Sequence, residues 1–193
     1  RVIEAGFRCV VAEAAYVHHA EHRTVREGPE RQALFARNLA WCQKRWGRRI
    51  RIAWLRCDAP APGSAELRQW LERLVSWTRR RSQVYVYCPS IRSGDKGGLF
   101  RSVGLAPHCD VLWHAIPPPF TPWVAMGLIL TRRKKRFDLI AASGTRWERW
   151  MSRLTWLHGA TVVSATDEAQ LVAQWQRKAW EPSRAAAHVE AMA

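Results

Sequence analysis

From residue 50 onward, short apolar segments alternate along the chain with longer segments in which apolar side chains recur every three or four positions. Segments of the first kind are typical of buried strands, and segments of the second kind are typical of amphipathic helices that pack on them. Strands and helices that alternate in this way favour a parallel sheet, so the pattern predicts the α/β class. The predicted strands are residues 50–55, 83–87, 110–115, 137–142 and 160–164.

Three helices are predicted around these strands, each with an apolar face at helical spacing. The first spans residues 65–80 with Ser64 as its N-cap, because a serine hydroxyl accepts a hydrogen bond from a backbone N–H of the first turn. The second spans residues 146–158 and ends at Gly159, and the third spans residues 167–180. The side chains predicted to face inward are Leu67, Leu71, Leu74 and Thr78 in the first helix and Trp147, Trp150, Met151, Leu154 and Leu157 in the second.

The residues before this region follow another pattern, which predicts a boundary near residue 49. Two short extended segments, residues 9–12 and 15–18, precede a helix that ends at Gly47. A strand-loop-helix unit is therefore expected before the sheet domain. The apolar face of its helix comprises Phe35, Leu39, Cys42 and Trp46. The predicted parts of the chain are residues 1–49, residues 50–182 and a tail of residues 183–193.

Composition narrows the class of protein. Lys and Arg number 31 against 16 Asp and Glu, a formal net charge of +15 that favours an anionic partner such as nucleic acid, a membrane surface or a phosphorylated substrate. The 5 cysteines lie far apart without a C-x-x-C pair, which argues against a disulfide framework and a zinc site and favours a reducing cytosol.

No segment predicts a membrane span. The apolar core of the longest nearly uncharged run, residues 123–130, is far shorter than the roughly 20 residues that cross a bilayer. The chain opens at Arg1 in a strand-like stretch without a signal-peptide pattern, so we interpret it as a fragment of a cytoplasmic protein, with peripheral attachment to the inner face of the plasma membrane as a further hypothesis.

The first unit carries the most informative motif. The stretch Gly6-Phe-Arg-Cys-Val-Val-Ala-Glu-Ala-Ala-Tyr-Val-His-His is followed by Arg37-Asn38 and then by Lys44-Arg-Trp-Gly. It resembles the C-terminal end of the GT-A catalytic domain of family 2 glycosyltransferases, with Glu13 in place of the family's proline. The resemblance implies a nucleotide-sugar donor and a divalent cation, Mn²⁺ or Mg²⁺, with His18 or His19 as a metal ligand beside an Asp-x-Asp motif that would precede Arg1. The alternative is that the two histidines end a surface strand.

Residues 50–180 carry a second resemblance. The stretch from Ile52 to Ser64, followed by a helix and by Val84-Tyr-Val-Tyr-Cys-Pro, is similar to the opening of family 4 GT-B glycosyltransferases. It implies a Rossmann-like parallel sheet that forms the N-terminal, acceptor-side half of a GT-B unit and needs no cofactor, with the donor half after Ala193. In that family a glycine-containing loop lets the backbone approach a donor phosphate, which implies substrate contact by Gly63 and Ser64. The alternative is an ordinary strand-to-helix turn.

Two later segments extend this resemblance. Asp110-Val-Leu-Trp-His is similar to a "D-V-[IV]-H" strand, and the stretch from Trp147 to Glu168 is similar to the family's "E-R" helix and following strand, without its aspartate. Ligands of open α/β sheets bind beyond the carboxyl ends of the strands, so polar residues there are candidates to line a substrate pocket. They are His114, Ser143, Ser164 and Thr166. The alternative for the serines is helix capping.

Five consecutive cations follow an apolar helix that carries a tryptophan. These are Arg132, Arg133, Lys134, Lys135 and Arg136. They either form a solvated helix end or contact an anionic lipid surface or a lipid diphosphate acceptor. The glycine-rich segment of residues 94–98 lacks the order of a P-loop and is predicted to be a mobile surface loop.

Together these features favour a fragment of a bacterial glycosyltransferase that moves a sugar from a nucleotide-sugar to a polysaccharide or lipid-linked acceptor. The fragment is expected to be inactive alone, and no catalytic residue is assigned. One alternative is a basic nucleic-acid-binding α/β module, which is less favoured because the chain lacks a recognition-helix pattern and an aromatic RNA-stacking motif. Another is a non-catalytic docking domain derived from a glycosyltransferase.

Overall fold

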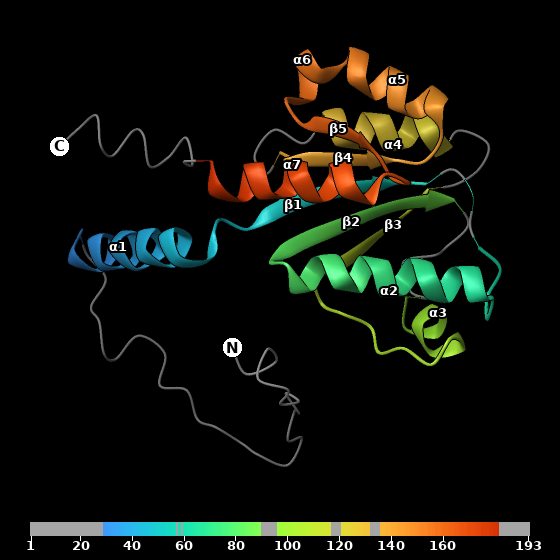
Figure 1. The fold of residues 1–193 in the computed structure, drawn as a ribbon, viewed down its shortest axis with the longest axis horizontal. Helices are drawn as coiled ribbons and strands as arrows, with labels where there is room; N and C mark the ends of the chain where they lie inside the picture. The colour runs from blue at the N-terminus through green and yellow to red at the C-terminus, as the bar shows by residue number, and fades with distance from the viewer. Residues whose placement is uncertain are drawn as a thin grey trace. The chain divides into compact units, whose positions relative to one another are not determined.

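A computed structural model of the chain describes residues 29–56, 58, 60–89, 96–116, 121–131 and 136–181. Its five strands form one parallel sheet in the order β3-β2-β1-β4-β5 (Figure 1). The predicted α/β class with a Rossmann-like parallel sheet is therefore confirmed. The strands are β1 (Ile50–Leu55), β2 (Ser82–Pro89), β3 (Val111–Ile116), β4 (Leu139–Ala142) and β5 (Thr161–Ser164). The helices are α1 (Pro29–Trp46), α2 (Ala65–Arg79), α3 (Lys96–Ser102), α4 (Thr121–Leu130), α5 (Thr145–Arg153), α6 (Thr155–His158) and α7 (Glu168–Trp180).

The central strand β1 is apolar from Ile52 to Leu55 because both of its faces are covered there. Ile52 and Trp54 belong to the core cluster on one face of the sheet, and Ala53 and Leu55 belong to the cluster on the other. A strand that is buried on both faces reads as a continuous apolar run, which is how it was recognisable in the sequence.

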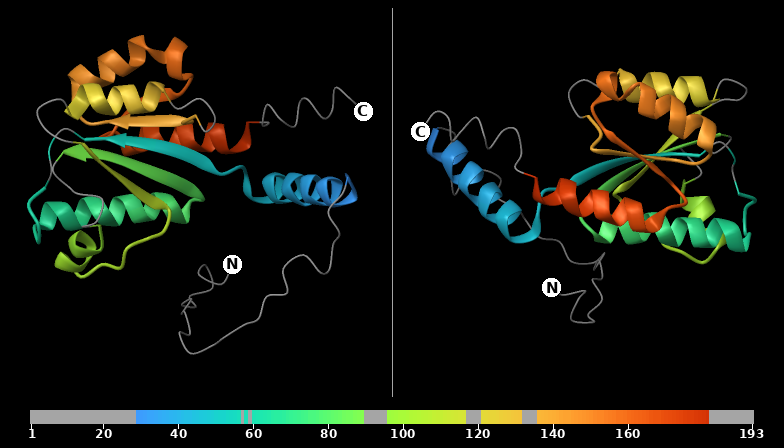
Figure 2. Two further views of the ribbon diagram at one scale, coloured as in Figure 1. Left: turned by 180° about the vertical axis from the view of Figure 1, so that it is seen from behind. Right: turned by 45° about the horizontal axis from the view of Figure 1, so that its top comes forward.

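Helices cover both faces of the sheet (Figure 2). Side chains of α2, α3 and α7 pack into the cluster that contains Trp54, whereas those of α4 and α5 pack into the cluster that contains Leu55. In α2 the predicted inward residues are buried, and so are Trp70 and Trp77, which widen the apolar face. The predicted N-cap is also confirmed, because the Ser64 hydroxyl accepts a hydrogen bond of 3.1 Å from the backbone N–H of Leu67.

The predicted helix of residues 146–158 is two helices in the structure. Helix α5 ends before Leu154, where the backbone leaves the helical conformation (φ −96°, ψ 11°), and α6 follows and ends at Gly159 in the left-handed conformation (φ +67°). Met151 is buried as predicted. The prediction that Trp150 and Leu157 face inward is wrong, since they are 37% and 40% exposed.

Helix α1 confirms the helix predicted before the sheet and its end at Gly47, which has a φ of +71° and donates a hydrogen bond of 2.8 Å to the carbonyl of Gln43. Its apolar face is exposed, with Phe35 and Leu39 at 62% and 57%. The chain divides into two compact units, Arg1–Ala40 and Trp41–Ala193, and the sheet lies in the second. The predicted extended segments before α1 and the predicted tail lie outside the described residues.

The segment before β1 is tied to the end of α7. The backbone N–H of Arg48 donates to the carbonyl of Ala179 at 2.8 Å, and its Nε donates to the carbonyl of Lys178 at 2.7 Å. Gly47 lies against the same turn, because a Cβ atom at this position would come within 3.0 Å of the Ala179 carbonyl oxygen. The first and last described segments of the sheet domain therefore meet.

Two further expectations concern helices. The segment 94–98 was predicted to be a loop, but α3 begins at Lys96, so this prediction is wrong for its last three residues. Leu99 and Phe100 of α3 pack into the core cluster that also contains the buried residues of α2, and this burial stabilises a helix that includes the two glycines before them. Among the described residues, no helix is both long and apolar enough to cross a membrane.

Candidate functional site

The strand order reverses between β1 and β4, where the two strands end side by side. The backbone N–H of Ser143, directly after β4, donates to the carbonyl of Leu55 at 2.8 Å. Arg56, directly after β1, donates from its backbone to the carbonyl of Tyr87 in β2 at 3.0 Å. In open α/β sheets this point of reversal is where ligands bind, because the connections on its two sides run to opposite faces.

An arginine held between two carboxylates occupies this position. Arg56 donates to Asp58 in a bidentate pair, from Nε to Oδ1 at 3.2 Å and from Nη2 to Oδ2 at 2.8 Å, and its Nη2 also reaches Glu66 Oε1 at 2.5 Å. The guanidinium carbon lies 4.9 Å from the ring centre of Trp70, a cation–π distance. The arginine side chain is only 13% exposed, whereas those of Asp58 and Glu66 are 69% and 64% exposed. The two carboxylates therefore face solvent while the largely buried Arg56 side chain holds them in place.

The hydrogen bonds of this Arg56 cluster favour the charged form of Asp58. The hydrogen bonds from Arg56 lower the pKa of Asp58 below its ordinary value. Glu66 lies in the first turn of α2, where the positive end of the helix dipole favours an anion. The cluster thus presents carboxylate oxygens as hydrogen-bond acceptors.

Gly63 and Ser64, which were predicted to approach a donor phosphate, lie beside this cluster and form hydrogen bonds with neighbouring residues instead. Gly63 has a φ of +76°, and its backbone N–H donates to the Ser102 hydroxyl at 3.2 Å. The Ser64 hydroxyl caps α2. A phosphate at this helix end would also meet the negative charges of Asp58 and Glu66. These contacts favour the alternative interpretation, an ordinary strand-to-helix turn that is closed by a cap.

His114 lies on the face of the sheet that α4 and α5 cover, rather than at the strand ends. Its ring stacks on Tyr87 with centres 4.9 Å apart and on Tyr85 with centres 5.9 Å apart, at interplanar angles of 11° and 13°. Both tyrosines also meet Phe137 edge-on. The half-buried imidazole is part of an aromatic row across β2 and β3, and its contact with a substrate stays a prediction.

The three remaining pocket candidates lie at the carboxyl edge of the sheet, where Ser143 follows β4, Ser164 ends β5 and Thr166 follows β5. Ser143 adjoins Leu55, and the hydroxyls of Ser164 and Thr166 lie 2.9 Å apart in a hydrogen bond to each other. The structure thus brings Ser143 to the end of the strand that leads into the Arg56 cluster. It places the Ser164 and Thr166 pair one strand further away, since β5 pairs with β4 and not with β1.

The predicted metal ligands His18 and His19 lie outside the described residues, as do Arg132, Arg133, Lys134 and Lys135 of the basic run. Arg136 is described and exposed. The divalent cation predicted for the first unit therefore stays a prediction.

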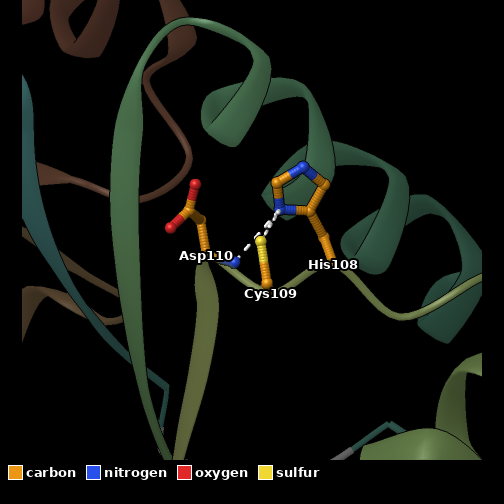
Figure 3. A group of neighbouring side chains, drawn as sticks. All are labelled: His108, Cys109 and Asp110. Atoms are coloured by element: carbon orange, nitrogen blue, oxygen red, sulfur yellow. Dashed lines mark hydrogen bonds between the residues drawn. The ribbon is translucent and has the colours of Figure 1, made fainter. Parts of the chain in front are cut away.

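At the amino end of β3, opposite the carboxyl ends of the strands, three consecutive residues of metal-binding types precede the strand (Figure 3). The Nδ1 atom of His108 lies 4.0 Å from the sulfur of Cys109 and accepts a hydrogen bond of 3.1 Å from the backbone N–H of Asp110. The Asp110 carboxylate forms an ion pair with Arg49. Because the imidazole lone pair and the carboxylate already have partners, these residues fit a turn that starts the strand better than an ion site.

Sequence reasoning selected Gly63 and Ser64 but missed the Arg56 cluster beside them. The signal that was available is the pair Arg56 and Asp58 directly after the predicted first strand. Charged residues at that position of an α/β fold are candidates for ligand contact. Comparison of the chain with family models, with curated proteins and with solved structures finds no match, so the fold and this cluster carry the functional argument.

Proposed function

We propose that the sheet domain is the acceptor-binding half of a nucleotide-sugar-dependent glycosyltransferase, in which the Arg56 cluster binds hydroxyl groups of a saccharide. In such a reaction an acceptor oxygen replaces the nucleoside diphosphate at the anomeric carbon of the donor sugar. The observation that carries the proposal is the position of Asp58 and Glu66, which are exposed and anchored by Arg56 where the strand order reverses.

The chemistry of the cluster suits a polyhydroxylated ligand. A carboxylate accepts hydrogen bonds from two neighbouring hydroxyls, and charged acceptors make the stronger hydrogen bonds of proteins. The two carboxylates disfavour a phosphate at the same place, so the cluster fits an acceptor sugar better than the diphosphate of a donor. The resemblance of residues 50–180 to the acceptor-side half of GT-B enzymes supports the same assignment.

The proposal is tested by binding of the intact chain to an array of bacterial surface glycans, with UDP and GDP as separate probes, followed by titration calorimetry with the glycans retained. We expect saccharide binding that Asp58→Asn and Glu66→Gln each weaken by roughly 10-fold or more, since a charge-assisted hydrogen bond contributes about 1.5–3 kcal/mol. The matched control is Glu72→Gln. Glu72 lies in α2, as Glu66 does, but its carboxylate pairs with Arg68 at 3.0 Å and lies outside the cluster.

Two results would contradict the proposal. One is the absence of saccharide binding across the array. The other is an equal loss of affinity in Glu72→Gln, which would assign the effect to net charge instead of to the cluster.

A further inference from the structure

Large apolar side chains are exposed on the outer surface of α4, α5 and α6, although side chains of this kind are usually buried. Trp156 is 78% exposed and Trp123 is 48% exposed, and α4 has no charged residue. The three helices lie together on one face of the sheet (Figure 1), on the side opposite α2. The exposed large apolar residues of these helices are Trp123, Val124, Leu128, Trp150, Trp156 and Leu157.

Tryptophans join this surface across two helices. Trp123 of α4 meets Trp147 and Trp150 of α5 edge-on, with ring centres 5.9 Å and 5.8 Å apart. Arginines of α5 lie over the same rings, Arg146 at 5.6 Å from the centre of Trp147 and Arg153 at 6.0 Å from that of Trp150. Exposed tryptophans and arginines are therefore interspersed on one continuous surface, which we call the α4–α6 face.

The cations of this face gather in an open hollow. Arg146, Arg149 and Arg153 follow one another at helical spacing along α5 and, with Trp150, line a hollow of about 300 Å³. Glu148 is the single acidic residue in the three helices. The hollow is thus suited to an anion such as a phosphate group, since a guanidinium binds phosphate oxygens through paired N–H donors.

We propose that the α4–α6 face docks on the surface of an anionic phospholipid bilayer. Tryptophan rings prefer the boundary between headgroups and acyl chains, where the apolar ring is buried and the indole N–H stays hydrated. The arginines of α5 bind lipid phosphates at the same depth, because their hollow lies directly beside Trp150. The charge of the face complements the negative surface potential of such a membrane.

Nucleic acid fits this face less well, although it is also a polyanion. A duplex presents phosphates and leaves exposed apolar side chains such as Trp156 and Leu157 in water, so their burial would not contribute to binding. A bilayer accepts both kinds of group at once. The membrane proposal is independent of the Arg56 cluster, because none of the residues that form the face belongs to it.

The test is flotation of the chain with vesicles of phosphatidylcholine alone and with vesicles that contain phosphatidylglycerol. We expect binding only to the anionic vesicles. The triple variant Arg146→Gln, Arg149→Gln, Arg153→Gln is expected to lower partitioning by roughly 100-fold, from the contribution of three cations near a charged leaflet. Trp156→Ser is expected to lower it by about 10-fold at low and at physiological salt, because it removes buried apolar area.

A matched variant separates this face from net charge. Arg68→Gln, Arg79→Gln, Arg101→Gln removes the same charge from α2 and α3, on the other face of the sheet, and is expected to keep more than half of the vesicle binding. Circular dichroism confirms that each variant is folded. Glu66→Gln is expected to bind vesicles as the parent chain does, so the membrane and saccharide proposals fail separately.

The membrane proposal is overturned by any of three results. The first is equal binding to phosphatidylcholine, and the second is an equal loss in the two triple arginine variants. The third is a duplex DNA affinity that exceeds the vesicle affinity and depends on Arg146, Arg149 and Arg153, with a steep salt dependence from counterion release.

Discussion

Replacement of His158 by leucine removes a buried polar link between α5 and β5. The imidazole is 4% exposed. Its Nε2 lies 2.9 Å from the Met151 carbonyl, and its Nδ1 accepts a hydrogen bond of 3.0 Å from the backbone N–H of Ala160. Since Nδ1 is the acceptor, the neutral ring carries its proton on Nε2 and donates it to Met151.

The expected cost follows from the partners that the leucine leaves behind. The Met151 carbonyl keeps a hydrogen bond from the backbone N–H of Leu154, whereas the N–H of Ala160, a buried residue, loses its acceptor. An unsatisfied buried donor costs about 1–3 kcal/mol, and an ordinary hydrogen bond contributes about 1 kcal/mol. We therefore expect His158→Leu to lower the free energy of unfolding by roughly 2–4 kcal/mol at pH 8, measured by urea denaturation.

The same residue makes the cost depend on pH. Burial lowers the pKa of His158 below its ordinary value of 6.5, although the hydrogen bond with the Met151 carbonyl acts in the opposite direction. The unfolded chain therefore binds this proton first as the pH falls. The stability that the neutral ring contributes is complete above about pH 6.5 and is lost below it, at up to about 1.4 kcal/mol per pH unit.

The difference in unfolding free energy between the parent chain and His158→Leu isolates this histidine from the others. It is expected to be largest at pH 8 and to shrink between pH 6.5 and pH 5. A difference that stays constant over this range would refute the argument, as would a cost below about 0.5 kcal/mol at pH 8, less than half the contribution of one hydrogen bond.

Two more substitutions test local contacts, each by urea denaturation against a matched variant. Gly47→Ala is expected to destabilise the chain more than Gly104→Ala does: both have positive φ, at +71° and +73°, but only at Gly47 would the new Cβ meet a backbone oxygen, at 3.0 Å. Equal costs would show that the contact with Ala179 is unimportant. Ser64→Ala is expected to cost about 1 kcal/mol through loss of the α2 cap. Ser76→Ala, which loses only a hydrogen bond to the carbonyl of Arg73 within the helix, should cost less, and the reverse order would contradict the role of the cap.

The parts of the fold that short-range patterns encode were predictable. Strand β1 has the predicted bounds, because its last four residues, from Ile52 to Leu55, are buried and form an uninterrupted apolar segment between Arg51 and Arg56. The start of α2 at Ser64 and the end of α6 at Gly159 were predictable because a hydroxyl cap and a left-handed glycine act within one turn.

The exposure of Trp150 was not predictable from spacing alone. It lies at the margin of the apolar stripe of α5, next to Met151, and its environment depends on whether another element covers it. In the structure its neighbour is Trp123 of α4, at 5.8 Å, and both rings stay partly exposed. Leu157 differs for another reason, since the break at Leu154 ends the helical phase on which its predicted position rested.

The sequence places Arg56 and Asp58 together, but the contact of Glu66 with Arg56 was not predictable, because a loop brings the two residues together. Glu66 is ten positions after Arg56, and only the turn at Gly63 brings the start of α2 back to the end of β1. Periodicity describes residues within one helix or strand and carries no information about such a return. The position of the cluster at the strand reversal depends in turn on β4, which pairs with β1 across more than eighty residues of chain.

The contact of Gly47 with Ala179 places the two ends of the sheet domain next to each other. The segment directly before β1 and the last turn of α7 therefore lie side by side. We therefore expect the sheet domain to tolerate circular permutation, with a short linker between these two segments and new ends in an exposed loop such as that of Ala106 and Pro107. For the same reason, the sheet domain can be inserted into a loop of another domain, because its adjacent ends leave the two ends of that loop close together.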